Sequence, residues 1–148
     1  MSTTIREATE DDIFDILILA KEFSKEAPST HTWNKNKTEA FLNSVLVNDT
    51  MVMFVLEVDG EIVGSILGLV IEVYMSHKVQ ATELAWFITK EYRGKPSSIR
   101  LVKAFENWAI DKGANQIGMG DIEGISNLEH LYTRMGYKKA ESIYIKEI

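Results

Sequence analysis

The sequence predicts a single α/β domain, in which helices flank a mixed and mostly antiparallel sheet. Two β-rich segments, 51–58 and 61–73, are joined by Asp59-Gly60, a dipeptide that strongly favours a two-residue hairpin. Segment 97–112 then repeats its apolar residues at helical spacing, and Gly113 follows it as a C-terminal cap. The chain has 148 residues, which is a typical length for one domain. We therefore expect one domain over residues 1–148.

The N-terminal part of the chain predicts one short strand and two helices. Ile5 opens the strand. Thr9 begins the first helix as its N-cap, and the acidic residues 10–12 lie in the first turn, where the helix dipole favours negative charge. This helix should end before Pro28, because proline disfavours helical backbone in the residue before it. A second helix is expected over 38–47, after a polar loop.

The remaining elements complete the order β-α-α-β-β-β-α-β-α-β. A third strand of an antiparallel meander is expected over 82–88, and a short strand over 116–119. A short helix should follow over 126–135. A last strand is expected over 137–148, with a polar break near its start.

Composition excludes several classes of function. The chain has no cysteine, which excludes a disulfide framework, a thiolate metal site and a cysteine nucleophile. Its net charge of -6 argues against general affinity for nucleic acid or anionic membranes, because such binding needs clustered lysine and arginine. The three histidines have no metal-ligand spacing, so we expect no metal. No apolar stretch has the length of a membrane span or a secretory leader, so we expect a cytoplasmic protein.

One stretch of the sequence combines a strand, a glycine-containing turn and an amphipathic helix. The stretch runs from Glu83 in the strand to Ala109 in the helix, and its turn reads Arg93-Gly94-Lys95-Pro96-Ser97-Ser98. Backbone N–H groups at the start of a helix have no partner within the helix, and they form a natural anion site. Any strand–turn–helix connection has such a helix start, so this geometry alone indicates phosphate binding only weakly.

This stretch resembles the central motif of the Gcn5-related N-acetyltransferase (GNAT) superfamily, in which a strand leads into a pyrophosphate loop and a long helix. A second match lies at Asn127 and Leu131-Tyr132-Thr133-Arg134-Met135-Gly136-Tyr137. The loop is also similar to that of small acetyltransferases of tailed bacteriophages. The resemblance covers nearly the whole chain. It implies direct transfer of an acetyl group from acetyl-coenzyme A to a primary amine of a small molecule or a protein.

The resemblance assigns roles to particular residues. Glu83 would be the base that removes the ammonium proton, and Tyr132 would protonate the leaving thiolate. Strand alternation places Glu83, Ala85 and Phe87 on one face. The pantetheine arm would add its amides to the strand edge near Phe87–Thr89. The residues expected to bind the cofactor are Phe87, Ile88, Thr89, Arg93, Gly94, Lys95, Ser97, Ser98, Asn127 and Tyr132.

Each of these residues also has a simpler reading. Glu83 can be a solvated residue at a strand edge, Tyr132 a core aromatic, and Asn127 a helix N-cap. Two loop positions that are usually glycine in the family are Pro96 and Ser98 here. Pro96 lacks an N–H and so removes one possible phosphate donor. The hydroxyl groups of Ser97 and Ser98 can donate hydrogen bonds instead.

Two other classes of function therefore stay open. The first is a non-catalytic acyl-coenzyme A binder or sensor of the same fold. The second is an interaction protein that binds no nucleotide. The sequence names neither the acceptor nor the oligomeric state, and a homodimer is one alternative.

Overall fold

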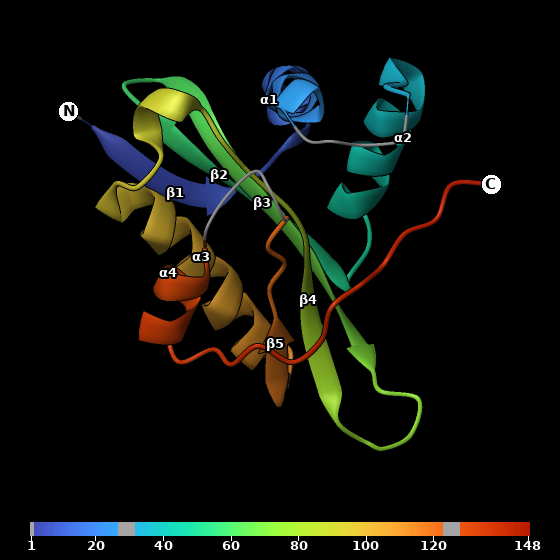
Figure 1. Cartoon of the computed structure of the whole chain (residues 1–148). Helices are drawn as coiled ribbons and strands as arrows, with labels where there is room; N and C mark the ends of the chain where they lie inside the picture. Colours follow the sequence, from blue (N-terminus) through green and yellow to red (C-terminus); the bar gives the residue numbers. More distant parts are fainter. Residues whose placement is uncertain (1, 27–31, 123–127) are drawn as a thin grey trace.

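The computed structural model describes residues 2–26, 32–122 and 128–148. Five strands form one sheet, and helices pack on both of its faces (Figure 1). The strands are β1 (Thr3–Glu7), β2 (Met51–Val58), β3 (Glu61–Glu72), β4 (Val79–Ile88) and β5 (Gln116–Gly118). The helices are α1 (Ile13–Glu26), α2 (Lys35–Leu46), α3 (Pro96–Asp111) and α4 (Glu129–Arg134), with 3₁₀ turns η1 (Glu10–Asp12) and η2 (Lys90–Tyr92).

The sheet follows the chain order, β1-β2-β3-β4-β5. The first four strands are antiparallel, and only β5 joins its neighbour β4 in the parallel direction. The β2–β3 hairpin turns at Asp59 and Gly60, whose φ angles are 50° and 86°. Two positive φ angles are the requirement of a type I′ turn, which explains why the dipeptide predicts this hairpin. The mixed, mostly antiparallel α/β fold predicted from the sequence is confirmed.

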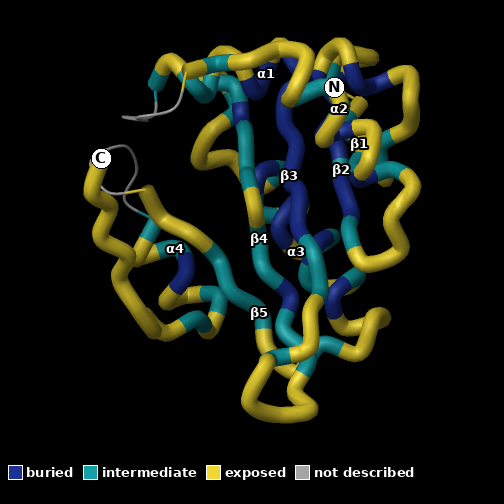
Figure 2. Tube along the Cα trace, turned by 90° about the vertical axis from the view of Figure 1, so that its right-hand side faces the viewer, coloured by how far each residue is buried: buried dark blue, intermediate teal, exposed yellow. Residues whose placement is uncertain are grey.

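Two apolar clusters hold the helices to the sheet. On one face α3 contributes Leu101, Val102, Phe105 and Ala109, all fully buried. On the other face α1 and α2 pack Ile16 and Leu42 against β2 and β3. Burial is densest along β2, β3 and α3, whereas the part around β5 and α4 is mostly half-buried or exposed, apart from the buried Tyr132 (Figure 2). The two residues predicted for catalysis, Glu83 and Tyr132, lie at this less buried end.

Several boundaries differ from the expected ones by a few residues, for local reasons. The helix expected over 38–47 begins at Lys35, because the Asn34 side chain accepts a hydrogen bond from the Lys37 N–H at 2.9 Å and caps it there. The strand expected over 82–88 begins at Val79, because β3 continues to Glu72 and pairs with it. The helix expected over 126–135 is described from Glu129 to Arg134.

The last strand, expected over 137–148, is wrong for the described structure. Residues 138–148 are all exposed and lie in no strand, and the chain end runs away from the sheet (Figure 1). Ile143 and Ile145 are each 80% exposed. A strand needs a neighbour for its backbone groups. The edge strand β5 has only three residues and pairs with β4 in the described structure.

Candidate active site

Strands β4 and β5 lie side by side for only three residue pairs and then separate. The pairs are Gln80 with Gln116, Ala81 with Ile117 and Thr82 with Gly118. Beyond Thr82, β4 continues to Ile88 with a neighbour on its β3 side alone. The two strands therefore form a fork that opens at Glu83 (Figure 1).

A β-bulge at the mouth of this fork decides which way Glu83 points. Leu67 pairs with Ala85, but the next residue on β3, Gly68, pairs with Glu83, so Leu84 is left without a partner. Paired residues on antiparallel strands point to the same face. A Cβ built on Gly68 would lie 2.2 Å from the Phe105 ring, so this position faces α3. Glu83 therefore faces α3 as well.

The expected alternation along β4 is therefore wrong for Glu83. Ala85 and Phe87 pack on the α1 and α2 side, whereas Trp86 and Ile88 pack on the α3 side. Without the bulge, Glu83 would share a face with Ala85 and Phe87. The extra residue reverses the alternation and places the carboxylate on the other side of the sheet.

The two residues proposed for catalysis meet at one residue, Gly120. Glu83 Oε1 accepts a hydrogen bond from the Gly120 N–H at 3.0 Å. The Tyr132 hydroxyl donates to the Gly120 carbonyl oxygen at 2.6 Å. Glu83 lies on β4, Gly120 follows β5, and Tyr132 lies on α4. The fold thus brings together two side chains that are 49 positions apart in the sequence.

Electrostatics give the two groups different protonation states. Burial raises the pKa of Glu83 to about 7, and the hydrogen bond from Gly120 opposes this rise. At neutral pH this carboxylate therefore takes up or releases a proton readily. Burial raises the pKa of Tyr132 above its usual value, and the negative charges of Glu83 and Asp121 raise it further. Tyr132 accordingly keeps its proton throughout the neutral range.

The hydroxyl proton of Tyr132 is directed to a carbonyl group and not into open space. The tyrosine is buried, and its ring lies 5.6 Å from the Tyr137 ring, between ring centres. Because the proton is held by Gly120, the free lone pair of the hydroxyl is what remains for a neighbouring molecule. Protonation of a leaving group by Tyr132 would require the bond to Gly120 to break.

The expected phosphate loop runs from η2 into α3. Gly94 has a φ of 74°, and a Cβ added there would meet nothing within 4 Å. Pro96 is the first residue of α3, where its missing N–H costs no helical hydrogen bond. The N–H groups of Gly94, Lys95 and Ser97 donate to no backbone group among the described residues. The loop therefore presents unpaired donors beside open space.

Ser98 and Arg93 are placed differently from the expectation. The Ser98 hydroxyl donates to the Lys95 carbonyl at 2.8 Å, and Ser98 is buried, so this hydroxyl is not free for a phosphate. Arg93 donates through Nε to the Ile88 carbonyl at 2.8 Å and through Nη2 to Glu26 at 2.7 Å. Arg93 thus fastens the loop to β4 and to the end of α1. Phosphate contact by Arg93 stays a prediction, and it would have to compete with Glu26.

The strand edge expected to hold the pantetheine arm is partly occupied. The Phe87 ring packs against Phe23, 5.0 Å between ring centres, and the Ile88 side chain is buried in the core. Ile88 can therefore meet a ligand only through its backbone, whereas the half-buried Phe87 ring is held by Phe23. The Thr89 N–H donates to Val63, and the Thr89 hydroxyl is buried with no partner among the described residues. Lys95 lies over the Tyr92 ring, 5.1 Å from its centre.

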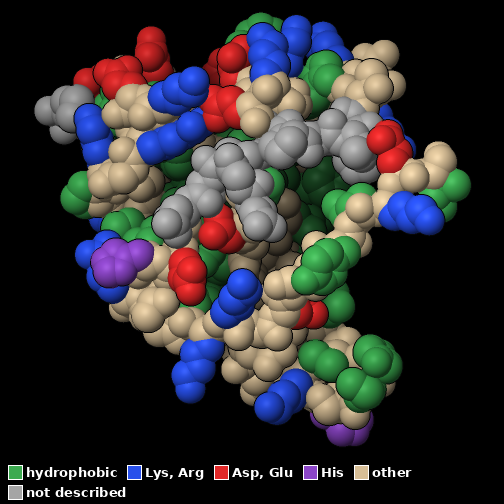
Figure 3. All heavy atoms as spheres, in the orientation of Figure 1, with side chains coloured by type: hydrophobic (Ala, Val, Ile, Leu, Met, Phe, Trp, Pro, Cys, Tyr) green, Lys and Arg blue, Asp and Glu red, His purple; other side chains and the backbone are tan. Residues whose placement is uncertain are grey.

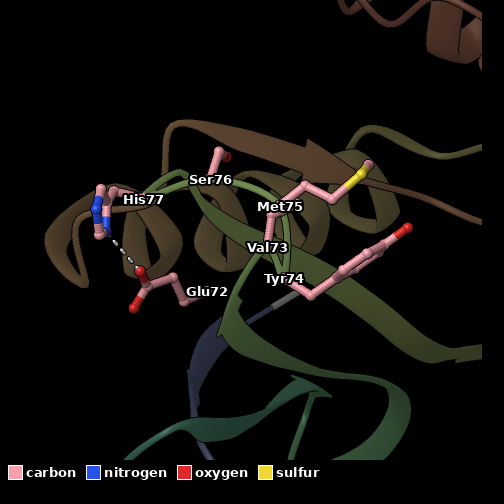
Figure 4. Close-up of a pocket in the computed structure, with 6 residues that line it drawn as sticks. All are labelled: Glu72, Val73, Tyr74, Met75, Ser76 and His77. Atoms are coloured by element: carbon pink, nitrogen blue, oxygen red, sulfur yellow. Dashed lines mark hydrogen bonds and ion pairs between the residues drawn. The ribbon is translucent and has the colours of Figure 1, made fainter.

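Other predicted features fall outside this cluster. Asn127 lies outside the described residues. A hollow of about 400 Å³ at the tip of the β3–β4 hairpin contains none of the predicted site residues; Figure 4 shows it, with His77 Nδ1 3.0 Å from Glu72 Oε1. The hairpin also carries exposed apolar side chains, among them Tyr74 and Met75, and hydrophobic atoms are visible at the lower right of Figure 3.

The described residues hold no group of three or more histidine, aspartate or glutamate side chains that could bind a metal. No helix among them combines the length and the apolar character that crossing a membrane requires.

Sequence reasoning missed Gly120 and Glu26. Gly120 acts through its backbone, and its only trace in the sequence is the run Gly118-Met119-Gly120 after a short strand. Glu26 reads as an ordinary charged residue at a helix end. Its hydrogen bond with Arg93 joins residues that are 67 positions apart, and no local sequence pattern predicts it.

The fold and the fork define an acyltransferase architecture. The model of the acetyltransferase (GNAT) family matches residues 11–137 of this chain. The chain therefore belongs to the acetyltransferase (GNAT) family, and the resemblance stated from the sequence is confirmed. The matched region ends at Tyr137, just before the exposed C-terminal segment.

Solved structures support the same fold. An AAC(6')-Iy structure in complex with the bisubstrate analogue CoA-S-monomethyl-acetylneamine has a TM-score of 0.82 and 14% identity, and the match covers 100% of this chain and 99% of that one. A putative acetyl transferase from Pyrococcus furiosus gives a TM-score of 0.79 at 22% identity, covering 99% and 100%. A GNAT family acetyltransferase from Staphylococcus aureus gives 0.74 at 18%, covering 100% of both chains.

Proposed function

We propose that this protein transfers an acetyl group from acetyl-coenzyme A directly to a primary amine, and that Glu83 and Tyr132 act at the reacting centre. The observation that carries the proposal is the cluster at the fork, where a carboxylate and a tyrosine hydroxyl share Gly120. This cluster lies in a chain of the acetyltransferase (GNAT) family. The acceptor is an amine of a small molecule or of a protein.

The residues of the η2–α3 loop fit coenzyme A. The unpaired N–H groups of Gly94, Lys95 and Ser97 are donors of the kind that phosphate oxygens accept. Gly94 leaves open space beside them, and the Thr89 hydroxyl is a buried polar group without a partner in the described chain. We assign these four residues to holding the coenzyme. When bound, acetyl-coenzyme A supplies the acetyl group as an activated thioester.

Glu83 supports the proton transfer that amine acetylation requires. A primary amine is protonated near neutral pH, and it must lose a proton to react. A base works best when its pKa lies near the operating pH, and burial raises the pKa of Glu83 to about 7. The carboxylate would accept the proton on the oxygen that is not held by Gly120, or through a water molecule.

Tyr132 has a smaller expected role. Its hydroxyl donates a hydrogen bond to the Gly120 carbonyl, and burial raises its pKa. Its oxygen can accept a hydrogen bond from an incoming ammonium group and so orient it. A coenzyme A thiolate leaves without much help, so protonation by Tyr132 is not essential to the proposal.

One observation favours the alternative of a non-catalytic acyl-coenzyme A binder. The anion site is weaker than the family pattern implies, because Pro96 has no N–H, the Ser98 hydroxyl is occupied and Arg93 is paired with Glu26. Such a protein would bind the coenzyme and release no thiol with any amine. Turnover separates the two functions.

The test has two stages. Micromolar acetyl-coenzyme A should raise the melting temperature, because a ligand that binds only the folded state stabilises it by mass action. Dephospho-coenzyme A should act similarly if the pyrophosphate dominates binding. A panel of amines, polyamines, amino acids and peptides is then screened for thiol release. No thermal shift at millimolar acetyl-coenzyme A would contradict both functions, and a shift without thiol release would favour the binder.

A proline-to-glycine change tests the loop itself. Pro96→Gly restores a backbone N–H at the start of α3, so coenzyme affinity should stay the same or rise. A clear loss of affinity would mean that the fixed φ of Pro96 shapes the loop. Pro28→Gly, a change at the other proline of the chain, is the control.

A further inference from the structure

Gly120 stands between the two proposed catalytic side chains and contacts both. Its N–H donates to Glu83 at 3.0 Å, and its carbonyl accepts from Tyr132 at 2.6 Å. These contacts use the two different peptide groups on either side of one α-carbon. We infer that Gly120 is a positioning residue, which fixes the Glu83 carboxylate and the Tyr132 hydroxyl relative to each other through its backbone. The inference rests on the proposed function for its catalytic meaning.

The position of Gly120 follows from the fork. If the parallel pairing of β4 with β5 continued past Thr82 and Gly118, the amide of Gly120 would meet the backbone of β4. The strands separate there, and the Gly120 N–H donates to no backbone group of the described chain. The Glu83 side chain reaches across and accepts that hydrogen bond in place of the strand. The carboxylate thus occupies the point where the two strands part.

The donor matters because of how Glu83 is buried. Among the described residues, Gly120 is the only hydrogen-bond donor to this carboxylate. A carboxylate withdrawn from water is unfavourable unless a partner compensates it. In the described part of the chain, Tyr132 on α4 and Asp121 beside Gly120 are the other titratable groups of this cluster, and the Tyr132 hydroxyl donates to Gly120 and not to Glu83. Loss of the Gly120 N–H would leave the ionised form of Glu83 without compensation.

Two substitutions at Gly120 separate the donor from the residue. Gly120→Pro removes the N–H and keeps the carbonyl. Gly120→Ala keeps both peptide groups, and its Cβ would lie 3.5 Å from Glu83 Oε1, an ordinary contact. The alanine variant is therefore the matched control. Any difference between the two variants reports the N–H donor and the proline ring, not the loss of glycine.

The first experiment needs no substrate and uses the wild-type chain. Nuclear magnetic resonance follows the Gly120 amide proton and the carboxyl carbon of Glu83 between pH 4 and 9. We expect the two signals to titrate with one midpoint, and the Gly120 titration to vanish in Glu83→Gln. The Gly118 amide, on β5, is the internal control. A Gly120 amide that does not follow Glu83 overturns the inference, whether or not the protein transfers acetyl groups.

The second experiment is kinetic. In Gly120→Pro the acidic limb of the rate profile should move to higher pH by about one unit, because one hydrogen bond to a carboxylate is worth roughly that much. Gly120→Ala should keep the wild-type midpoint. A folded proline variant with the wild-type midpoint contradicts the inference. If the proline variant does not fold, or if no amine is acetylated, the amide titration decides on its own.

Discussion

The β2–β3 hairpin and the β4–β5 fork are built in opposite ways. β2 and β3 pair from Met51–Leu69 to Val58–Glu61 with one bulge, at Val63, and residues 63–68 of β3 are all buried. β4 and β5 pair at three positions, and beyond them a side chain and a backbone amide make the connection. One region is held by apolar burial and a long ladder with a single bulge, and the other by single polar contacts. The two proposed catalytic residues, Glu83 and Tyr132, thus lie where regular pairing stops.

The two regions depend on each other through the bulge at Leu84. The rigid side of the sheet sets the register of β4 at Gly68, and this register turns Glu83 toward α3. A fork without a rigid neighbour would not hold a buried carboxylate in place. We therefore expect substitutions in the hairpin region to change stability and substitutions in the fork to change protonation.

The largest stability effect is expected for Phe105→Ala. Phe105 is fully buried on α3, and its ring lies over Gly68. Truncation of such a ring should lower the free energy of unfolding by about 3–5 kcal/mol. Urea denaturation measures it, with Ile110→Ala as the control, because Ile110 lies on the same helix and is 64% exposed. A loss below about 1 kcal/mol would show that the α3 face is not tightly packed.

Glu83→Gln should stabilise the protein at high pH. The folded pKa of Glu83, about 7, lies above its ordinary value of 4.5, so the folded state binds the proton more tightly than the unfolded state. Protonation of Glu83 therefore contributes fully to the free energy of unfolding of the wild type below pH 4.5. This contribution is lost as pH rises through 7, and the loss amounts to about 3 kcal/mol. Glutamine does not titrate.

Thermal unfolding at several pH values tests this prediction. The Tm advantage of Glu83→Gln over the wild type should be small at pH 4 and large at pH 8. The exposed Glu61→Gln is the control and should show no such trend. If the Tm difference between Glu83→Gln and the wild type is the same at pH 4 and pH 8, the pKa of Glu83 is not raised in the folded state.

The same glycine-to-alanine substitution can be made in each region, at Gly68 on β3 of the hairpin and at Gly120 in the fork. A Cβ at Gly68 would lie 2.2 Å from the Phe105 ring and 2.9 Å from the Thr82 carbonyl oxygen, so the sheet or the ring must move. Such overpacking costs about 1–3 kcal/mol. At Gly120 the nearest contact is 3.5 Å, and stability should change little. Equal losses at both sites, measured by urea denaturation, would contradict the contrast between the regions.

The smallest effect is expected in the C-terminal segment. Ile143 and Ile145 are each 80% exposed and lie in no strand. Ile143→Ser and Ile145→Ser should each change the free energy of unfolding by no more than about 0.5 kcal/mol. Ile66→Ser, a change at a fully buried residue of β3, is the contrasting control. A large loss from the tail variants would mean that these side chains pack against the domain.

Local signals made most of the fold predictable. The hairpin at Asp59-Gly60 follows from two residues that tolerate positive φ, and α3 follows from its apolar stripe. Both depend on neighbours in the sequence. The last strand was not predictable in this way, because pairing requires a partner edge and β5 offers only three residues.

The candidate site was predictable only in part. Glu83 and Tyr132 could be named because their side chains match a family pattern. The direction of Glu83 could not be read, because the bulge at Leu84 depends on how Gly68 and Phe105 pack across the sheet. Gly120 makes its contacts through its backbone, so its residue type does not predict them. The contacts become visible only when the positions of β5 and α4 are known.

The most direct test of the central claim is the pH dependence of acetyl transfer by Glu83→Gln, once thiol release has identified an amine. We expect kcat to fall by about 10²–10⁴-fold, because a general base is lost. The acidic limb of the profile should disappear, while acetyl-coenzyme A affinity, measured by thermal shift, should stay near the wild-type value. A Glu83→Gln enzyme that works at the wild-type rate across the pH range would contradict the account, and solvent would then be the acceptor of the amine proton.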